Sequence, residues 1–241
     1  MKFFRLLLSV CGFLLLMAPA ANAQKIIEKS APVGSKQQVV LDLKQATTIK
    51  IRGGSGSQLR VRAAVTINQN KLNDALQLTL STEDDRITVK SAFDEAMLRT
   101  GQPADCPESN GQTSWVSGGG NNGRNSYRVC SNVDVEIEVP EGVSLRVNTI
   151  SGNIEASGLT GQLEAKSISG FVDVTWSAGQ GAEVAFKTIT GEVYTDQDIA
   201  FTNRKPGVPM VGYEVRGSLG KTGPLVRLES ISNDVYFRKR K

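Results

Sequence analysis

The sequence predicts an all-β protein whose C-terminal half is a parallel β-helix, or β-solenoid, continuous with an N-terminal region of alternating strands. Three observations support this prediction. Apolar and polar residues alternate with a period of two along most of the chain, which is typical of strands with one buried and one solvated face. A helical period is scarce, since residues 71–76 and 93–99 offer only one or two turns. A short Ile-containing corner recurs between strands in the second half.

Residues 1–23 have the composition of a secretory signal peptide. Two basic residues precede an apolar run at residues 6–17, and residues 21–23, Ala-Asn-Ala, form a small-residue cleavage site. A bilayer span needs roughly 20 apolar residues, so this run is too short to cross one; a retained membrane anchor is the alternative. We therefore expect an exported bacterial protein, periplasmic or associated with the cell surface, with no stable membrane insertion after cleavage and with residues 24–241 as a single domain.

Alternating runs fill the N-terminal region, and each predicts a strand with one buried face. The clearest is residues 133–139, where Val and Ile alternate with Asp and Glu. An acidic segment at residues 83–85 separates two of the runs and predicts a hairpin turn. The other runs lie at residues 38–43, 48–52, 59–63, 65–67, 76–80 and 87–90.

Residues 102–131 interrupt the alternation and predict a long loop or insertion rich in Gly, Asn and Ser. Cys106 and Cys130 lie at its two ends. An exported chain folds in an oxidising compartment, so we expect these cysteines to form a disulfide, which would stabilise the fold by about 3 kcal/mol by restricting the unfolded chain. Long loops are commonly functional, which makes this one a candidate binding loop. Its interaction-capable side chains are Trp115, Arg124, Tyr127 and Arg128.

Four units of similar pattern occupy residues 141–241, which we interpret as a repeat solenoid. In each unit a short strand leads into a corner of Ile, then Ser or Thr, then a closing Gly or Asn, and a second short strand follows. Apolar residues recur seven and five positions before the closing residue and two positions after it. The closing residues, which we expect to be structural corners, are Gly152, Gly170, Gly191 and Asn233.

Each closing residue is expected to have a positive φ angle, which Gly adopts without steric cost and Asn tolerates next best. Stacking of strands at about 4.8 Å then predicts one internal ladder of isoleucines. The spacing leaves room for a further unit near Gly212, but its flanking residues do not fit, so whether residues 197–224 form a regular rung stays open. The predicted members of the ladder are Ile150, Ile168, Ile189 and Ile231.

An antiparallel sandwich whose corners match by coincidence is the competing fold. Each unit of a solenoid cannot bury its apolar face alone, so stacked units must share apolar positions. The four matching apolar columns therefore favour the β-helix.

The composition excludes several kinds of chemistry. The 28 basic and 24 acidic residues are close to balance, so the sequence has no nucleic-acid footprint. The chain has no His, which excludes a His-based catalytic relay. The two cysteines outside the predicted signal peptide do not by themselves make a metal site. Neither a metal nor another cofactor is therefore predicted. Acidic residues recur beside the corners at strand positions that point outward, so we interpret them as a solvated face rather than as a catalytic pair. They are Glu155, Glu164, Asp173 and Glu192.

Residues 139–143, Val-Pro-Glu-Gly-Val, lead into the first corner, Thr-Ile-Ser-Gly at residues 149–152. Together with the signal-like start and the repeated corners, this pattern resembles the bacterial "putative adhesin" β-strand-repeat family of unknown function, and it is similar to head GIN-type adhesin domains. The resemblance covers residues 28–240 apart from the Cys-bounded insertion. It implies a right-handed β-helix-like fold in the bacterial envelope, and it assigns no catalytic or binding residues.

We therefore expect a non-enzymatic, exported cell-envelope protein that acts as an adhesin-like binding or structural module. Its expected partner is an unidentified envelope protein or a surface polysaccharide. The alternative is a glycan-active β-helix enzyme that uses paired carboxylates. A third possibility is a purely structural or sensing role in the periplasm.

Overall fold

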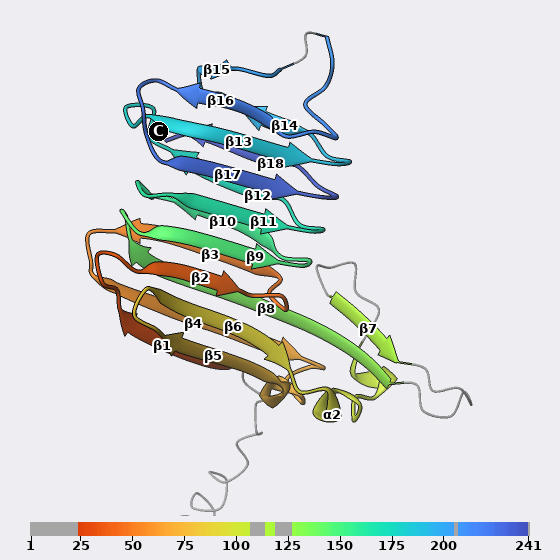
Figure 1. The fold of residues 1–241 in the computed structure, drawn as a ribbon. Coiled ribbons are helices and arrows are strands. Elements are labelled where there is room, and N and C mark those ends of the chain that lie inside the picture. The colour runs from red at the N-terminus through yellow and green to blue at the C-terminus, as the bar shows by residue number, and fades with distance from the viewer. Residues whose placement is uncertain (1–23, 107–113, 119–126, 205–206, 241) are drawn as a thin grey trace, which may run out of the picture.

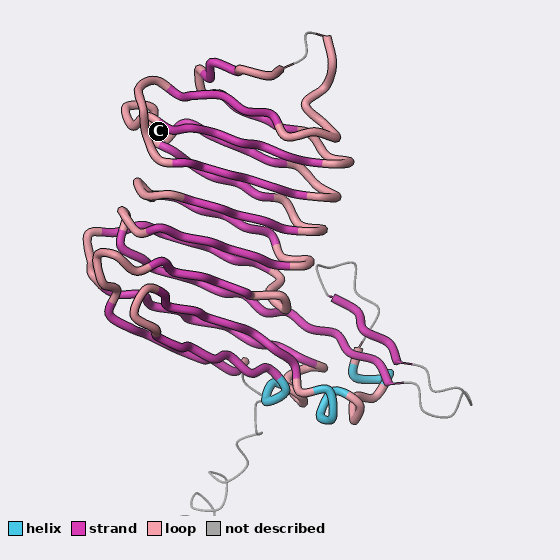
Figure 2. The backbone as a smooth tube through the Cα atoms, viewed as in Figure 1, coloured by secondary structure: helices cyan, strands magenta, loops and turns pink. Residues whose placement is uncertain are grey.

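The computed structural model describes residues 24–106, 114–118, 127–204 and 207–240, which form two long β-sheets that face each other (Figure 1). Strands dominate the described residues, and the helical segments among them are short (Figure 2). The predicted signal peptide, residues 1–23, lies outside the described residues. The all-β prediction is confirmed. The helical segments are η1 (Asn73–Ala75), α2 (Glu95–Leu98) and η2 (Pro103–Asp105).

Sheet A has the strand order β1-β4-β8-β3-β10-β12-β18-β14, and β7 pairs with β8 beside this path. The strands from β8 to β14 run parallel to one another, while β1 and β4 are antiparallel to their neighbours. Its strands are β1 (Lys25–Pro32), β3 (Thr48–Gly54), β4 (Gln58–Ile67), β7 (Ser114–Gly118), β8 (Tyr127–Pro140), β10 (Asn153–Ser157), β12 (Val172–Trp176), β14 (Val193–Thr195) and β18 (Val235–Lys239).

Sheet B has the order β15-β16-β13-β17-β11-β9-β2-β6-β5. Its middle strands, from β13 to β6, are parallel, and antiparallel strands flank them on both sides. Its strands are β2 (Gln38–Asp42), β5 (Leu76–Thr82), β6 (Arg86–Phe93), β9 (Ser144–Thr149), β11 (Leu163–Ser167), β13 (Ala182–Thr188), β15 (Ile199–Phe201), β16 (Val215–Leu219) and β17 (Leu225–Ser230).

The core lies between the two sheets because the alternating sequence turns one face of each strand inward. In β8, every second residue from Val129 to Val139 is buried. At the C-terminal end the core becomes aromatic. The ring of Phe237 lies 5.3 Å from that of Phe186 and 6.3 Å from that of Trp176, and all three side chains are fully buried.

The repeat units stack in an order that differs from their order along the chain. We call one strand of sheet B, its corner and the next strand of sheet A a rung. The last rung of the chain, β17 and β18, inserts between β11–β12 on one side and β13–β14 on the other. The sequence predicted stacked units but gave no reason to expect this interleaving. The two mixed sheets are established, whereas the β-helix winding and its hand stay predictions.

Residues 197–224 do not form a regular rung. Where the structure describes them, they contain β15 and β16, which are antiparallel to their neighbours in sheet B. Gly212 donates its N–H to the carbonyl of Thr188 at 2.7 Å, so this segment still caps the corner of the β13 rung.

Candidate functional site

A chain of buried hydroxyls links the corners of the four rungs. Each hydroxyl stands three residues before the closing residue, accepts the closing residue's N–H and donates to a backbone carbonyl of the neighbouring rung. For example, Ser167 accepts from Gly170 N and donates to the carbonyl of Gly152, both at 2.9 Å. Ser230 repeats this pattern toward Gly170. The four hydroxyl residues are Thr149, Ser167, Ser230 and Thr188.

The predicted reason for glycine at the corners is wrong. None of the four closing residues, Gly152, Gly170, Gly191 and Asn233, has a positive φ angle. The three glycines are needed because of the neighbouring rung: a Cβ atom on Gly170 would overlap the Gly152 carbonyl, and one on Gly191 would overlap the Asn233 carbonyl. Asn233 uses its side chain differently, since its Oδ1 accepts the N–H of Asp234 at 2.8 Å.

The predicted internal ladder of isoleucines is also wrong, because these side chains face solvent. The corner hydroxyl takes the last buried position of each strand, so the Ile that follows it points outward. The four corners nevertheless stack: Ile168 N donates to Ile150 O at 3.1 Å, and Ile189 N to Ile231 O at 3.2 Å. We call Ile150, Ile168, Ile231 and Ile189, in this spatial order, the isoleucine row.

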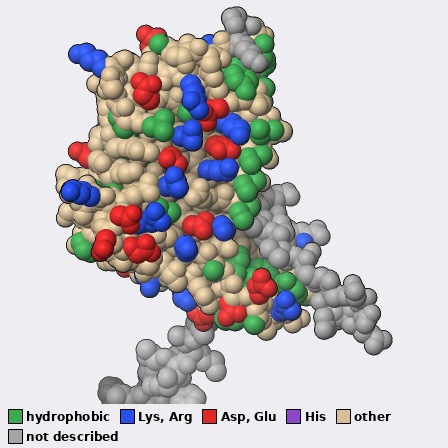
Figure 3. Space-filling model, viewed as in Figure 1, with side chains coloured by type: hydrophobic (Ala, Val, Ile, Leu, Met, Phe, Trp, Pro, Cys, Tyr) green, Lys and Arg blue, Asp and Glu red, His purple; other side chains and the backbone are tan. Residues whose placement is uncertain are grey.

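The isoleucine row forms an exposed apolar edge. Ile150, Ile168 and Ile189 are 43%, 39% and 44% exposed, and Ile231 is half-buried. Figure 3 shows hydrophobic side chains gathered along the edge at which β9, β11, β17 and β13 end. Contiguous exposed apolar surface of this kind is typical of interaction sites.

The predicted disulfide between Cys106 and Cys130 is present, with Cα atoms 5.6 Å apart. The segment that it closes is only partly a loop, which corrects the prediction for residues 102–131. The closed segment contains the strand β7 and the start of β8, which pair as an antiparallel hairpin, and η2 immediately precedes Cys106. The hairpin extends beyond the body of the two sheets (Figure 1).

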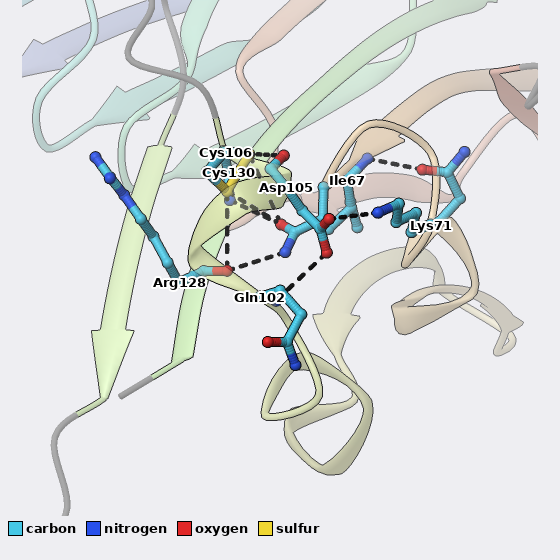
Figure 4. Close-up of a disulfide and its surroundings, with 9 residues drawn as sticks. Ile67, Lys71, Gln102, Asp105, Cys106, Arg128 and Cys130 are labelled. Atoms are coloured by element: carbon cyan, nitrogen blue, oxygen red, sulfur yellow. Dashed lines mark hydrogen bonds and ion pairs between the residues drawn. A yellow bond between two sulfur atoms is a disulfide. The ribbon is translucent and has the colours of Figure 1, made fainter. Parts of the chain in front are cut away.

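A buried turn holds the base of this hairpin (Figure 4). Asn68 is fully buried; its Oδ1 accepts the N–H of Cys130 at 3.0 Å and its Nδ2 donates to the carbonyl of Arg128 at 2.9 Å. The residues Asn68, Gln69 and Asn70 all have positive φ angles, a conformation that costs free energy in residues other than glycine. The hydrogen bonds of Asn68 offset that cost, so this turn positions β8 next to the disulfide.

An ion pair supports the same region. Lys71 Nζ lies 2.5 Å from Asp105 Oδ1, and the Asp105 carboxylate is nearly buried (Figure 4). The Lys71 ammonium lowers the pKa of Asp105, chiefly by hydrogen bonding, against the opposing effect of burial. Asp105 also accepts the N–H of Gln102 at 3.4 Å, so one carboxylate joins η2 to the turn after β4.

The structure places the predicted loop residues on the hairpin. In the β7–β8 register, Trp115 lies opposite Cys130 and Tyr127 opposite Gly118. Tyr127 and Arg128 are half-buried, and the Arg128 side chain extends away from the disulfide (Figure 4). Arg124 lies outside the described residues. The binding role of these residues stays a prediction.

The acidic residues beside the corners lie on the outer faces of the sheets. Glu164 pairs with Arg146 at 3.0 Å, and Asp173 pairs with Arg238 at 2.9 Å. Burial raises the pKa of Asp173, while Arg238 acts in the opposite direction. Glu155 is half-buried and Glu192 is exposed. In the described part of the chain no group of three or more Cys, Asp or Glu residues could hold a metal ion, and no helix there is long and apolar enough to cross a membrane.

Sequence reasoning missed two features of this region. The column of Ser and Thr three positions before each closing residue was visible, but its role in tying the rungs together was not inferred. Strict alternation from Leu145 through Val147 would have placed Thr149 inside and the following Ile outside. The turn at Asn68 left only a weak signal, the segment Asn-Gln-Asn after a strand, because Asn is the residue that best tolerates a positive φ angle after Gly.

The chain matches no protein-family model and no curated protein sequence. Among solved structures it is similar to a "putative cell adhesion protein" from Clostridium sporogenes, with 11% identity, a TM-score of 0.49, and coverage of 90% of this chain and 100% of that one. It is also similar to a "putative adhesin" from Bacteroides fragilis, with 10% identity, a TM-score of 0.23 and coverage of 90% and 97%. A "putative lipid binding protein" from Parabacteroides distasonis has 10% identity, a TM-score of 0.25 and the same coverage.

Proposed function

We propose that this chain is an exported, non-enzymatic module of the bacterial cell envelope that binds a surface partner through its stacked rungs. Residues 24–241 would form one domain wound as a right-handed β-helix. The isoleucine row is the observation that supports the proposal best. It presents apolar side chains at each of four successive corners, along an edge that no described element covers.

The stacking of the rungs does not require isoleucine at these positions. The corner hydroxyls and the backbone hydrogen bonds already join one corner to the next. Exposed apolar side chains gain free energy only when they leave water, at about 25 cal/mol per Å² of buried area. A partner that covers the row would supply that gain, which explains why a large apolar residue stands where a polar one would serve the fold.

The test removes the apolar surface and keeps the β-branched shape. We expect the triple variant Ile150→Thr, Ile168→Thr, Ile189→Thr to fold normally and to lose most of its partner capture in crosslinking from living cells. The matched control is Ile26→Thr, since Ile26 is also exposed, at 41%, but lies on β1. Equal capture by the triple variant and by the unchanged chain would remove the isoleucine row from the proposal.

The β7–β8 hairpin is a second candidate contact, because the disulfide and the Asn68 turn fix its base and it extends beyond the body of the two sheets (Figure 1). A photoreactive group at position 115 would test it in the same cells. A captured envelope protein or polysaccharide that is absent when residues 107–129 are deleted would place the partner on the hairpin, provided that the shortened chain keeps its strand content.

The alternative function is a glycan-active enzyme with paired carboxylates. A shallow hollow on sheet A favours it, since strands β1, β4 and β8 bring Glu28, Glu136 and Glu138 together with Arg60 and Arg62. These groups are exposed and form ion pairs, such as Arg60 with Glu138 at 3.5 Å and Arg62 with Glu136 at 3.6 Å. Release of sugar from envelope polysaccharide that stops with Glu136→Gln or Glu138→Gln would support the enzyme; unchanged release would exclude these carboxylates.

A further inference from the structure

Three aromatic side chains form a second row on the outer face of sheet A. Phe171 immediately precedes β12, Tyr236 lies on β18 and Tyr194 lies on β14, and these are three neighbouring strands of sheet A. The rings of Tyr194 and Tyr236 stack with centroids 5.2 Å apart and planes 13° apart, and Phe171 meets Tyr236 edge-on at 6.3 Å. We call these three residues the aromatic row.

The aromatic row ends in an open ring face. Sheet A ends at β14, so among the described residues no strand of that sheet lies beyond Tyr194. One face of the Tyr194 ring is covered by Tyr236, and the side chain is still 45% exposed. A large, rigid aromatic surface is therefore available to a ligand at the edge of the sheet.

Polar groups around the row are fixed by hydrogen bonds. The Tyr236 hydroxyl donates to Asp234 Oδ2 at 2.9 Å, and the N–H of Glu192 donates to Asp234 Oδ1 at 2.8 Å. The pKa of Tyr194 is raised chiefly by a hydrogen bond with Glu192. The pKa of Tyr236 is raised chiefly by its hydrogen bond with Asp234. Both hydroxyls therefore remain protonated donors at neutral pH.

A cation also lies over the Tyr236 ring. The guanidinium of Arg238 lies 4.7 Å from the Tyr236 ring centroid and pairs with Asp173 at 2.9 Å. The row thus combines an open aromatic face with carboxylates and hydroxyls at fixed positions. Ligand sites typically combine apolar or aromatic surface with a few such oriented polar groups.

We propose that the aromatic row binds a hexose unit of an uncharged or amino-substituted glycan, with the open face of Tyr194 stacked against the sugar ring. One face of a hexopyranose is lined by C–H groups and suits an aromatic ring, while its hydroxyls point to the rim. Glu192 lies beside Tyr194 and accepts hydrogen bonds from those hydroxyls. The inference rests on the proposed function as a binding module and names a ligand class for it.

The charges of the site decide between ligand classes. Arg238 neutralises the carboxylate of Asp173, whereas Asp234 accepts hydrogen bonds from two neutral donors, the Tyr236 hydroxyl and the Glu192 N–H. The carboxylates of Asp234 and Glu192 therefore repel an acidic polysaccharide. A hydroxyl-rich ligand of low charge uses both the aromatic face and the fixed acceptors. The favoured ligand is therefore a neutral or amino-substituted sugar rather than a uronic acid polymer.

The test uses the full chain after signal removal and three oligosaccharide probes: an N-acetylglucosamine tetramer, a cellulose tetramer and a hyaluronan tetramer. Binding is measured by saturation-transfer NMR and titration. We expect the first or second probe to bind, the acidic one not to bind, and Tyr194→Ala to weaken binding by at least about tenfold. Tyr194→Phe keeps the ring and is the matched control, which should retain most of the affinity.

Binding of neither uncharged probe, preferential binding of hyaluronan, or equal affinity of Tyr194→Ala and the unchanged chain would overturn the inference. Far-UV circular dichroism and urea unfolding of each variant show whether it is folded. The outcome is separable from the proposed function: if no sugar binds but the isoleucine row still captures an envelope partner, the aromatic row fails and the binding module stands.

Discussion

Ser167 shows how one buried residue joins two rungs. Its hydroxyl is fully buried and satisfies two backbone groups, the N–H of Gly170 and the carbonyl of Gly152. A buried polar group without a partner costs more than the hydrogen bond itself contributes. The repeated Ser or Thr is therefore needed for the corner, while the Ile beside it is free to serve another purpose.

Replacement of Ser167 by Ala leaves a buried N–H and a buried carbonyl without this partner. We expect Ser167→Ala to lower the free energy of unfolding by about 2 kcal/mol, measured by urea denaturation. The matched control is Ser169→Ala in the same corner, since Ser169 is exposed and should change stability by less than about 0.5 kcal/mol. Equal effects of the two variants would contradict the role of the buried hydroxyl.

Gly170 makes a steric prediction at the same corner. Its ordinary φ angle permits Ala, so the cost of Gly170→Ala comes only from overlap of Cβ with the Gly152 carbonyl. We expect a loss of about 3 kcal/mol. Gly179→Ala is the control, because a Cβ atom there meets nothing within 4 Å, and its unfolding free energy should change by less than about 1 kcal/mol.

Asp105 predicts a pH dependence at the base of the hairpin. Its folded-state pKa is lowered from 3.8, chiefly by hydrogen bonding to Lys71, so its stabilising effect is complete above the unfolded pKa and is lost as the pH falls through the folded pKa. Amide exchange at residues 68–72 should be slower in the unchanged chain than in Asp105→Asn at neutral pH; the difference should shrink as the pH falls below 3.8 and vanish only below the lowered folded-state pKa. Asp74→Asn, which removes the exposed pair with Lys25, is the control and should show little difference at either pH.

At the scale of elements, the disulfide restricts the segment between η2 and β8. Cys106 and Cys130 are separated by 24 positions, so reduction frees a loop of moderate length in the unfolded chain. We expect the double variant Cys106→Ser, Cys130→Ser to lose about 3 kcal/mol of unfolding free energy. The unchanged chain with reductant should match the variant, and a variant as stable as the oxidised protein would contradict the prediction.

Much of the element pattern could be predicted because alternation reports directly on a half-buried strand. The run at residues 133–139 is the clearest example, and it lies within β8. β7 could not be predicted, since Ser114–Gly118 has little alternation and pairs only with the start of β8. The prediction of a buried isoleucine ladder was wrong for a different reason. Ile is usually buried, and only the hydrogen bonds of the corner show that a hydroxyl takes the inner position. The aromatic row also depends on pairing across strands that are distant in sequence, as between Tyr194 and Tyr236.

The whole molecule is interleaved, because its last rung lies inside the stack. β18 separates β12 from β14, and β17 separates β11 from β13. In a stack built in sequence order, loss of the last rung would expose only the rung before it. Here the last rung inserts between two rungs that precede it in the sequence. The contacts that complete the stack therefore join distant parts of the sequence, and proteins with many such contacts typically fold slowly.

Removal of residues 225–241 tests this interleaving. We expect hydrogen exchange to lose protection in β13, β14, β15 and β16 as well as at the exposed edges of β11 and β12. The reason is that β13 loses its parallel partner β17, and β14 loses β18, the one strand with which it pairs among the described residues. Removal of residues 24–32 is the control, since β1 is an edge strand and its loss should affect only β4. The contrary outcome is full protection of β13 in the shortened chain, which would mean that β13 moves by one strand spacing, about 4.8 Å, to pair with β11. That result would show that the corners of different rungs are interchangeable, since β13 would then use the edge of β11 that β17 occupies in the full chain.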